Sequence, residues 1–242
     1  MVARRPLIFG VVGWGDPTSA GLYDATYCTL GGVAKSEPDP SVTCLTANEY
    51  VCNRLALALG LPVPPGAFIR TVDRSVAFVS LRFGSLTESI PPVIPADLAR
   101  DQPLVAGGII AFDCWIRNSD RHTGNLAYRK GVIPPTMFDH GLCLGGESRS
   151  GIAGLSNEIS KPGYPHCLSA HIKTARHLEN WLTTIKALPL VTMTSILEEV
   201  VSVNLLTSRE AKMITAFLRH RQMHLHSVLQ QTLSHLPDWG LL

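Results

Sequence analysis

The sequence lacks several features that would assign it to a familiar class at once. Its six cysteines include no C-x-x-C pair, which argues against a zinc knuckle, and a chain of 242 residues rarely needs a disulfide framework. No stretch approaches the roughly 18 uninterrupted apolar residues that would span a bilayer. Internal repeats are also missing. We therefore expect a cytoplasmic protein with reduced cysteines and no membrane span.

Charge is scarce as well. Only 17% of the residues are charged and the formal net charge is +2, so no direct binding of nucleic acid or of an acidic membrane is expected. The G-x-S-x-G turn of serine hydrolases does not occur. The chain does contain 45% hydrophobic residues, which is ample for one large domain or for two lobes. Function has to be argued from a local site.

Most of the functional information lies in a polar run near the middle of the chain. Residues 118–125 spell Asn-Ser-Asp-Arg-His-Thr-Gly-Asn, and fourteen residues after this run residues 139–141 spell Asp-His-Gly. Two carboxylates and an amide on two loops form the kind of set that holds nucleotide-bound magnesium and orients an attacking hydroxyl. Asp120 is the candidate proton acceptor, and Asn125 and Asp139 are the candidate magnesium ligands. An Asp-Arg pair alone is more often a salt-linked loop, so the hypothesis depends on the whole set.

A β-rich segment precedes this run and contains a lysine. Residues 7–12 predict a strand, and the glycine-rich residues 13–21 predict an irregular loop. Residues 22–29 and 33–35 predict a hairpin around a turn with two glycines. Lys35 would then lie on a strand from which its ammonium group could reach bound phosphates. A solvent-facing strand lysine is the alternative.

A helix is predicted from Thr46 to about Leu59, where a glycine and a proline stop it. Thr46 and Glu49 have the spacing of a capping box, in which the Glu49 carboxylate accepts a hydrogen bond from the backbone amide of Thr46. In the alternative interpretation Glu49 pairs with Lys35 and holds it toward the phosphates. The sequence leaves both interpretations open.

The remaining pattern predicts a change from strands to helices. Strands at 67–70 and 75–81 complete a small β-rich lobe. The Gly-, Ser- and Pro-rich segment 145–165 predicts an exposed, mobile loop, and Thr207 with Glu210 predicts a capping box. The other predicted elements are a buried helix at 103–117, short strands at 126–128 and 136–138, and helices at 177–188, 194–205 and 208–233.

Taken in order, these motifs resemble an atypical protein kinase. The resemblance is greatest to the HipA-like kinases and more distant to the phosphatidylinositol 3- and 4-kinases. His122 and Gly124 favour the HipA-like side. The motifs that carry the resemblance are 33–35 (Val-Ala-Lys), 48–50 (Asn-Glu-Tyr), 59–64 (Leu-Gly-Leu-Pro-Val-Pro), 82–83 (Arg-Phe), 118–125 and 138–141 (Phe-Asp-His-Gly).

The resemblance implies an α+β, two-lobed protein-kinase-like fold that binds ATP and magnesium between its lobes. The N-lobe would span residues 1–83, with one helix, and the mostly helical C-lobe residues 84–242. Asp120 would be the catalytic base, with Asn125 and Asp139 as magnesium ligands. The nucleotide would be bound by Lys35 through its phosphates, by the segment Leu81-Arg82-Phe83 beside the adenine, and by Glu49 and His122.

Three departures from the family bear on function. The loop at 13–21 does not spell G-x-G-x-x-G, position 81 is leucine where HipA toxins tend to carry an acidic residue, and the chain is shorter than a full HipA toxin. The favoured function is phosphorylation of a protein serine or threonine, with a regulatory or antitoxin-like partner. The alternatives are a small-molecule or lipid kinase or a nucleotidyl transferase on the same fold, and an inactive nucleotide-binding module.

Overall fold

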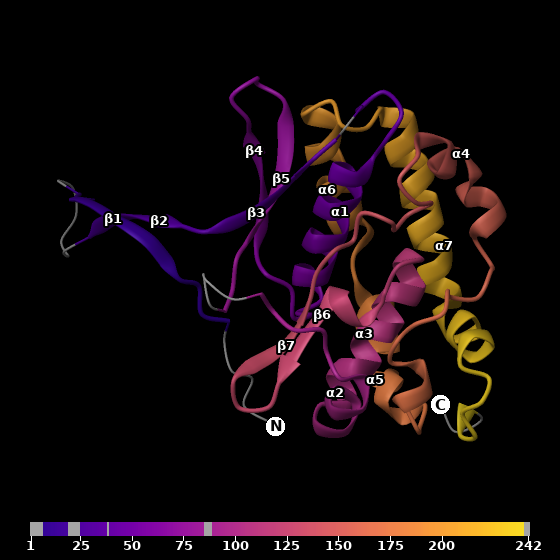
Figure 1. The fold of residues 1–242 in the computed structure, drawn as a ribbon. Coiled ribbons are helices and arrows are strands. Elements are labelled where there is room, and N and C mark those ends of the chain that lie inside the picture. The colour runs from indigo at the N-terminus through magenta and orange to yellow at the C-terminus, as the bar shows by residue number, and fades with distance from the viewer. Residues whose placement is uncertain (1–6, 19–24, 38, 85–88, 240–242) are drawn as a thin grey trace.

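The computed structural model describes residues 7–18, 25–37, 39–84 and 89–239. A β-rich N-terminal region with one long helix lies beside a mostly helical C-terminal region (Figure 1). The described ranges contain seven α-helices. None of these helices combines the length and the apolar character needed to cross a membrane.

Two small antiparallel sheets make up the β-rich region. β1 (Val11–Pro17) and β2 (Thr26–Leu30) form a two-stranded arm that projects away from the body of the molecule (Figure 1). The second sheet has the order β3-β5-β4. Its strands are β3 (Gly32–Ser36), β4 (Gly66–Arg70) and β5 (Val76–Leu81). β3 is an edge strand, and it carries Lys35 opposite Phe78.

The structure corrects the predicted start of the chain. The expected strand begins only at Val11, and it continues through the first part of the expected loop to Pro17 because the backbone of β1 pairs with β2. The hairpin predicted between 22–29 and 33–35 is wrong, since β2 pairs with β1 and β3 pairs with β5. The glycines mark a break between two strands rather than a turn, since Gly31 alone separates β2 from β3, and local residues do not determine which strands pair. The part of the predicted loop and hairpin at 19–24 lies outside the described residues.

The single helix of the β-rich region is α1 (Leu45–Ala58), and it is buried along most of its length. It packs on the three-stranded sheet, where Tyr50 stacks on Phe68 with ring centroids 3.8 Å apart. The predicted capping box is wrong because the helix begins earlier than a box at Thr46 requires. The N-cap is Cys44, and the carboxylate of Glu37 accepts the hydrogen bond from the Thr46 amide at 2.5 Å.

The helical region surrounds α3 (Pro103–Ile116), which confirms the helix predicted there. Phe112 and Trp115 of α3 are fully buried, and Trp115 donates its indole N–H to the carbonyl of Leu218 at 2.9 Å. The predicted strand pair is also confirmed, as β6 (Leu126–Arg129) and β7 (Ile133–Met137). Further elements are α2 (Pro95–Asp101), η1 (Thr123–Asn125), η2 (Ser169–His171), α5 (Arg176–Ala187), α6 (Leu190–Ser202) and α7 (Ser208–Thr232).

The predicted mobile loop at 145–165 contains a helix, which corrects the sequence-based expectation. This helix is α4 (Arg149–Glu158), and it packs against α7 with Ile152 and Leu155 buried. Glycine and serine have low helix propensity, so the sequence alone favoured a loop. Tertiary burial of two apolar side chains overrides that preference. The second capping box, between Thr207 and Glu210, is confirmed at the start of α7.

Candidate active site

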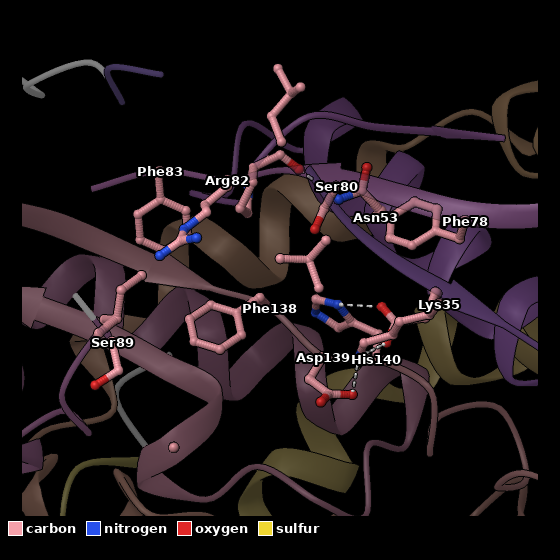
Figure 2. Close-up of a pocket in the computed structure, with 16 residues that line it drawn as sticks. Lys35, Asn53, Phe78, Ser80, Arg82, Phe83, Ser89, Phe138, Asp139 and His140 are labelled. Carbon is pink, nitrogen blue, oxygen red and sulfur yellow. Dashed lines mark hydrogen bonds and ion pairs between the residues drawn. The ribbon is translucent and has the colours of Figure 1, made fainter. Parts of the chain in front are cut away.

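A cavity of about 350 Å³ lies between the three-stranded sheet, α1 and the segment that follows β7 (Figure 2). Several residues that the sequence predicts for a nucleotide site line this cavity. The predicted residues that line the cavity are Lys35, Glu49, Leu81, Arg82, Phe83 and Asp139. The loop that contains Asp120 and Asn125 contributes Gly124 to the same wall. Residues far apart in the sequence therefore border one space.

Lys35 lies between two carboxylates of this site. Its ammonium nitrogen lies 2.5 Å from Glu49 Oε1 and 2.7 Å from Asp139 Oδ1 (Figure 2). The Lys35 side chain remains 36% exposed, so its ammonium group is not sealed from the cavity. Glu49 pairs with Lys35, as one of the two sequence interpretations holds.

The pKa values of Lys35, Glu49 and Asp139 depend on one another and on burial. Burial by itself lowers the pKa of Lys35, but the Glu49 and Asp139 carboxylates outweigh burial and raise it. Burial raises the pKa of Asp139, but its hydrogen bond and attraction to Lys35 outweigh that effect and lower it. Burial dominates for Glu49 and raises its pKa. Asp139 is thus the carboxylate that keeps its charge more readily.

The backbone at Asp139 adopts an uncommon conformation. Its φ of 64° lies in the left-handed region, which a residue other than glycine enters only when its surroundings hold it there. Arg121 supplies part of that support, because its Nη1 group donates to the carbonyls of Phe138 at 2.6 Å and Asn125 at 2.8 Å. The Phe138 amide also donates to the Asn125 carbonyl, at 3.2 Å. One arginine thus ties the two candidate loops together.

His140, next to Asp139, is buried and neutral. Burial lowers the pKa of His140 to about 3. Its Nδ1 lies 4.0 Å from Glu49 Oε2, and its ring contacts Phe112 edge-on at a centroid distance of 6.1 Å. The side chain therefore backs the Lys35–Glu49 pair without adding a charge.

A buried charged cluster underlies the Asp120 loop, and its central residue is not among the candidates predicted from the sequence. Asp113 of α3 accepts from Arg121 Nε at 2.7 Å, from Asn118 Nδ2 at 3.0 Å and pairs with His166 Nε2 at 3.0 Å. Burial opposes ionisation of Asp113, but Arg121 and His166 outweigh it and lower its pKa. A lone acidic residue in an apolar helix was the available signal, since a fully buried aspartate almost always has a partner.

Asp120 is held by hydrogen bonds to Asn118, which belongs to this cluster, and to Asn125. Asn118 accepts from the Asp120 amide at 2.9 Å, and the Asn125 amide nitrogen donates to the Asp120 carbonyl at 2.9 Å and to its carboxylate at 3.2 Å. The Asp120 side chain stays 41% exposed. His122 caps η1 by accepting from Gly124, and its Nε2 lies 3.8 Å from Asp120. His122 is not among the residues that line the 350 Å³ cavity.

Asn125 and Asp139 carry oxygen atoms of the type that magnesium prefers. The Asn125 amide nitrogen is turned to Asp120, so its Oδ1 is the atom left to coordinate a cation, and Asp139 uses only Oδ1 toward Lys35. Within the described ranges, no three His, Cys, Asp or Glu side chains gather into a metal-binding group. Magnesium commonly takes one or two protein oxygens and completes its shell with phosphates and water.

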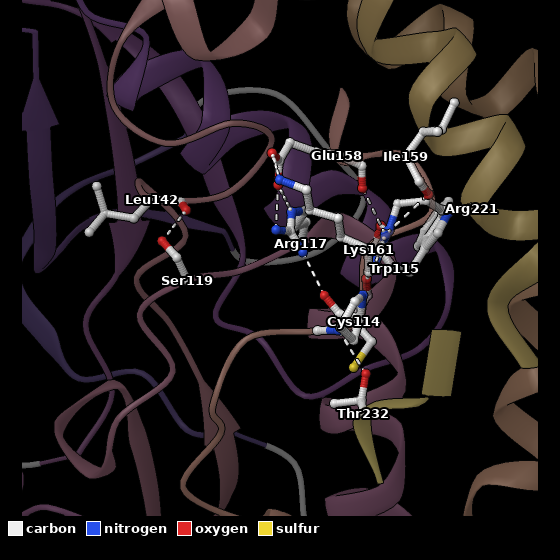
Figure 3. A network of polar contacts seen from close by, with 12 residues as sticks. Cys114, Trp115, Arg117, Ser119, Leu142, Glu158, Ile159, Lys161, Arg221 and Thr232 are labelled. Atoms are coloured by element: carbon white, nitrogen blue, oxygen red, sulfur yellow. Dashed lines mark hydrogen bonds and ion pairs between the residues drawn. The ribbon is translucent and has the colours of Figure 1, made fainter. Parts of the chain in front are cut away.

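A second cavity, of about 360 Å³, borders the Asp120 loop at Ser119. Ser119 donates its hydroxyl to the carbonyl of Leu142 at 3.0 Å (Figure 3). Arg117 closes another side, where its Nε donates to Glu158 at 2.8 Å and its guanidinium lies 4.3 Å from the ring centroid of Tyr164. The wall also contains Gly145, Gly146, Gly151 and Gly154.

A buried arginine of α7 holds the end of α3 by hydrogen bonds. Arg221 donates to the carbonyls of Cys114 and Trp115, at the end of α3, and to that of Lys161 at 2.8 Å (Figure 3). Burial lowers the pKa of Arg221 to about 10, so it remains charged at neutral pH. The end of α3, which leads directly into the Asp120 loop, is thereby bonded to α7, and α7 in turn is bonded to the segment that follows α4.

Known proteins offer structural but not sequence matches. No protein-family model matches the sequence, and no curated protein sequence matches it. The structure is similar to that of the proinflammatory kinase CtkA of Helicobacter pylori, with a TM-score of 0.54 and 13% identity over 92% of this chain and 97% of that one. A chain of the HipA, HipB and operator DNA complex of Shewanella oneidensis MR-1 gives a TM-score of 0.42 and 13% identity over 98% of this chain and 68% of that one. The predicted kinase-like α+β fold is confirmed.

Proposed function

We propose, from this kinase-like fold, that the chain is an ATP- and magnesium-dependent phosphotransferase that acts on a protein serine or threonine. The observation that carries the proposal is the position of Lys35, 2.5 Å from Glu49 and 2.7 Å from Asp139 on the wall of the 350 Å³ cavity. Phosphoryl transfer requires a fixed cation at the nucleotide phosphates and carboxylates that hold the metal and the attacking hydroxyl. All of these groups border this cavity or the adjoining loop.

Each residue has a role in this proposal. When a nucleotide binds, the Lys35 ammonium group moves from Asp139 to the nucleotide phosphates. Glu49 keeps the Lys35 side chain oriented. Asn125 and Asp139 hold magnesium, which neutralises charge on the phosphate oxygens during transfer. The Leu81-Arg82-Phe83 segment, with Phe138 beside it, forms an apolar slot for the adenine; the rings of Phe83 and Phe138 are 6.0 Å apart.

Asp120 faces the acceptor. Its carboxylate is exposed and is oriented by Asn125, which suits a group that accepts a hydroxyl proton. The second cavity begins at the preceding residue, Ser119, and two glycines of its wall, Gly146 and Gly154, have open space where a side chain would stand, so a backbone can approach there. Both features support a protein segment as the acceptor, and we place its hydroxyl at Asp120.

The remaining assignments are part of the same proposal. We place the boundary between the two lobes after residue 83, at the segment beside the adenine slot, and we assign His122 to orienting Asp120. All six cysteines are free, which supports a reducing compartment such as the cytoplasm. A regulatory, antitoxin-like partner stays a prediction from the sequence resemblance.

The test is phosphoryl transfer by the purified chain with magnesium and γ-labelled ATP. We expect label on the chain itself or on a protein in a lysate, and loss of at least about 100-fold in Asp120→Asn and in Asp139→Asn. Asp73→Asn is the matched control, because Asp73 lies in an exposed turn and its bonds to Thr71 and Ser75 can also be made by asparagine. The control should retain activity.

Other results would favour the alternatives. Label found only in lipids or small molecules would indicate a different acceptor, and label transferred from α-labelled rather than γ-labelled ATP would indicate a nucleotidyl transferase. ATP binding without any transfer would indicate an inactive nucleotide-binding module.

A further inference from the structure

The helix that contains Glu49 is bonded to the segment that follows Asp139. The residue responsible is Asn48, which is 1% exposed. Its amide nitrogen lies 2.8 Å from the carbonyl of Gly141, 2.9 Å from that of Cys143 and 2.8 Å from that of Gly146. An amide nitrogen has two hydrogens, so it can satisfy two of these carbonyls at any moment. One side chain of α1 thus holds a loop more than ninety residues away.

The start of α1 has a second attachment to the same segment. The Cys44 amide donates to the carbonyl of Glu147 at 2.8 Å, and the Arg149 amide donates to the carbonyl of Val42 at 2.9 Å. These bonds flank an isolated antiparallel bridge between Thr43 and Ser148. The backbone bridge fixes the beginning of the helix, and Asn48 fixes its next turn.

The hydrogen bond from Asn48 to Gly141 matters because both residues are close in sequence to the two carboxylates that contact Lys35. Asn48 directly precedes Glu49, and Gly141 lies two residues after Asp139. The bond therefore sets the separation of the two carboxylates between which Lys35 lies. Carboxylates so close to one another repel, and without a restraint they would separate or one would take up a proton.

The stability of the fold does not by itself explain why position 48 is an asparagine. Its Oδ1 atom is buried and has no hydrogen-bond partner within the described residues. An unpaired buried carbonyl oxygen costs free energy, so an asparagine here is not the most stabilising choice. A role in geometry accounts for the donated bonds, and the fold tolerates the unpaired oxygen beside them.

We propose that Asn48 is a positioning residue for phosphoryl transfer, which holds Glu49 and Asp139 at the separation that places Lys35 between them. The proposal rests on the proposed function for its effect on catalysis. Its geometric part stands on the hydrogen bonds alone, and the two parts are tested separately.

The variants are Asn48→Leu, which keeps the size of the side chain and removes its donors, and Asn48→Ser, which keeps one hydroxyl donor. Gln222→Leu is the matched control. Gln222 is equally buried, and its amide nitrogen donates to two distant carbonyls, those of Ile185 and Leu188, both at 2.8 Å, within the helical region. The control measures the effect of losing a buried bridging amide away from Lys35.

The first measurement is the kinetics of the full chain with magnesium and ATP. We expect kcat to fall about 100-fold in Asn48→Leu, because small displacements of reacting groups have effects of that size. The dissociation constant for ATP should change much less, and Asn48→Ser should retain more activity than Asn48→Leu. Gln222→Leu should keep kcat within about threefold. Equal kcat losses in Asn48→Leu and Gln222→Leu would overturn the positioning role.

The second measurement does not depend on activity. An amine-reactive reagent labels lysines, and mass spectrometry compares the labelling rate of Lys35 with that of exposed Lys173. We expect Lys35 to react about tenfold faster in Asn48→Leu, because its two carboxylates move apart, and to be unchanged in Gln222→Leu. Unchanged labelling in Asn48→Leu would overturn the proposal.

The outcomes separate the two proposals. A wild-type chain that binds ATP but transfers nothing contradicts the proposed function, while the labelling result still decides the geometry. If both Asn48 variants fail to fold while Gln222→Leu folds, Asn48 has a general structural role and the positioning proposal is wrong.

Discussion

The two sides of the candidate site are held in place by different forces. The Asp120 loop rests on a fully buried cluster in which Arg121 and Asp113 share two hydrogen bonds. Lys35 lies on an edge strand whose residues are mostly exposed, and the contacts that hold its ammonium group are ion pairs to Glu49 and Asp139. The loop geometry is therefore part of the core, whereas the position of Lys35 depends on charge. Changes in pH or in the bound ligand should move the lysine first.

The largest effect should come from breaking the buried cluster. Arg121→Met removes the guanidinium that neutralises Asp113 and leaves a buried carboxylate with weaker partners. The free energy of unfolding, measured by urea titration, should fall by about 3–5 kcal/mol. Arg100→Met is the control, because Arg100 pairs with Asp97 and Asp101 on the surface and its loss should change stability little. Similar results for the two variants would mean that the cluster does not anchor the loop.

The next effect is a pH dependence that originates at His140. The unfolded side chain takes up a proton below its ordinary pKa of 6.5, whereas the buried side chain stays neutral down to about 3. The unfolded state thus binds more protons in this window, and stability falls as the pH falls. The contribution is about 2 kcal/mol between pH 6.5 and pH 5.

His140→Gln should remove this contribution from the slope of unfolding free energy against pH. The measurement is urea titration at pH 6.5 and pH 5 for both proteins, and the difference between their slopes isolates His140. Parallel slopes would show that His140 is accessible to protons in the folded state.

A smaller effect is expected on the charge-dependent side of the site. Glu49→Gln keeps the size of the side chain but leaves Lys35 with Asp139 as its main partner, so the lysine is held on a proposed magnesium ligand. The rate of transfer from γ-labelled ATP should fall about tenfold, which corresponds to about 1.4 kcal/mol.

Glu37→Gln provides the comparison for Glu49→Gln. Glu37 accepts the hydrogen bond from the Thr46 amide at the start of the same helix, and a glutamine oxygen can accept it as well. This variant should keep its activity within about twofold. If Glu49→Gln were as active as Glu37→Gln, the pairing of Glu49 with Lys35 would have no role in transfer.

The smallest effect should come from the β1–β2 arm, which lies outside both sides of the site (Figure 1). Trp14 on β1 is 73% exposed, and Trp14→Ser should change the free energy of unfolding by less than about 0.5 kcal/mol. Trp115→Ala, at a fully buried tryptophan of α3, should cost about 3–5 kcal/mol. A large loss in Trp14→Ser would show that the arm packs on the body in solution.

Local patterns predicted those elements that form from local signals, even where their packing partners are distant. The buried helix α3, the β6–β7 pair, and α7 with its capping box were all predicted, because hydrophobic spacing and turn residues act over a few positions. The predictions failed where a distant segment decides the structure. The sequence could not show that β3 pairs with β5, or that burial of Ile152 and Leu155 makes α4 a helix.

The candidate site divides in the same way. Chemical type and order along the chain are enough to select the candidate residues, which are Lys35, Glu49, Asp120, Asn125 and Asp139. The folded chain is needed to see that Glu49 pairs with Lys35 and does not cap a helix, because that depends on where the helix begins and on Glu37, which supplies the cap. The tertiary structure also decided the supporting contacts of Asp113 and Asn48. Most buried polar groups in proteins have hydrogen-bond partners, and the fold alone brings those partners within reach.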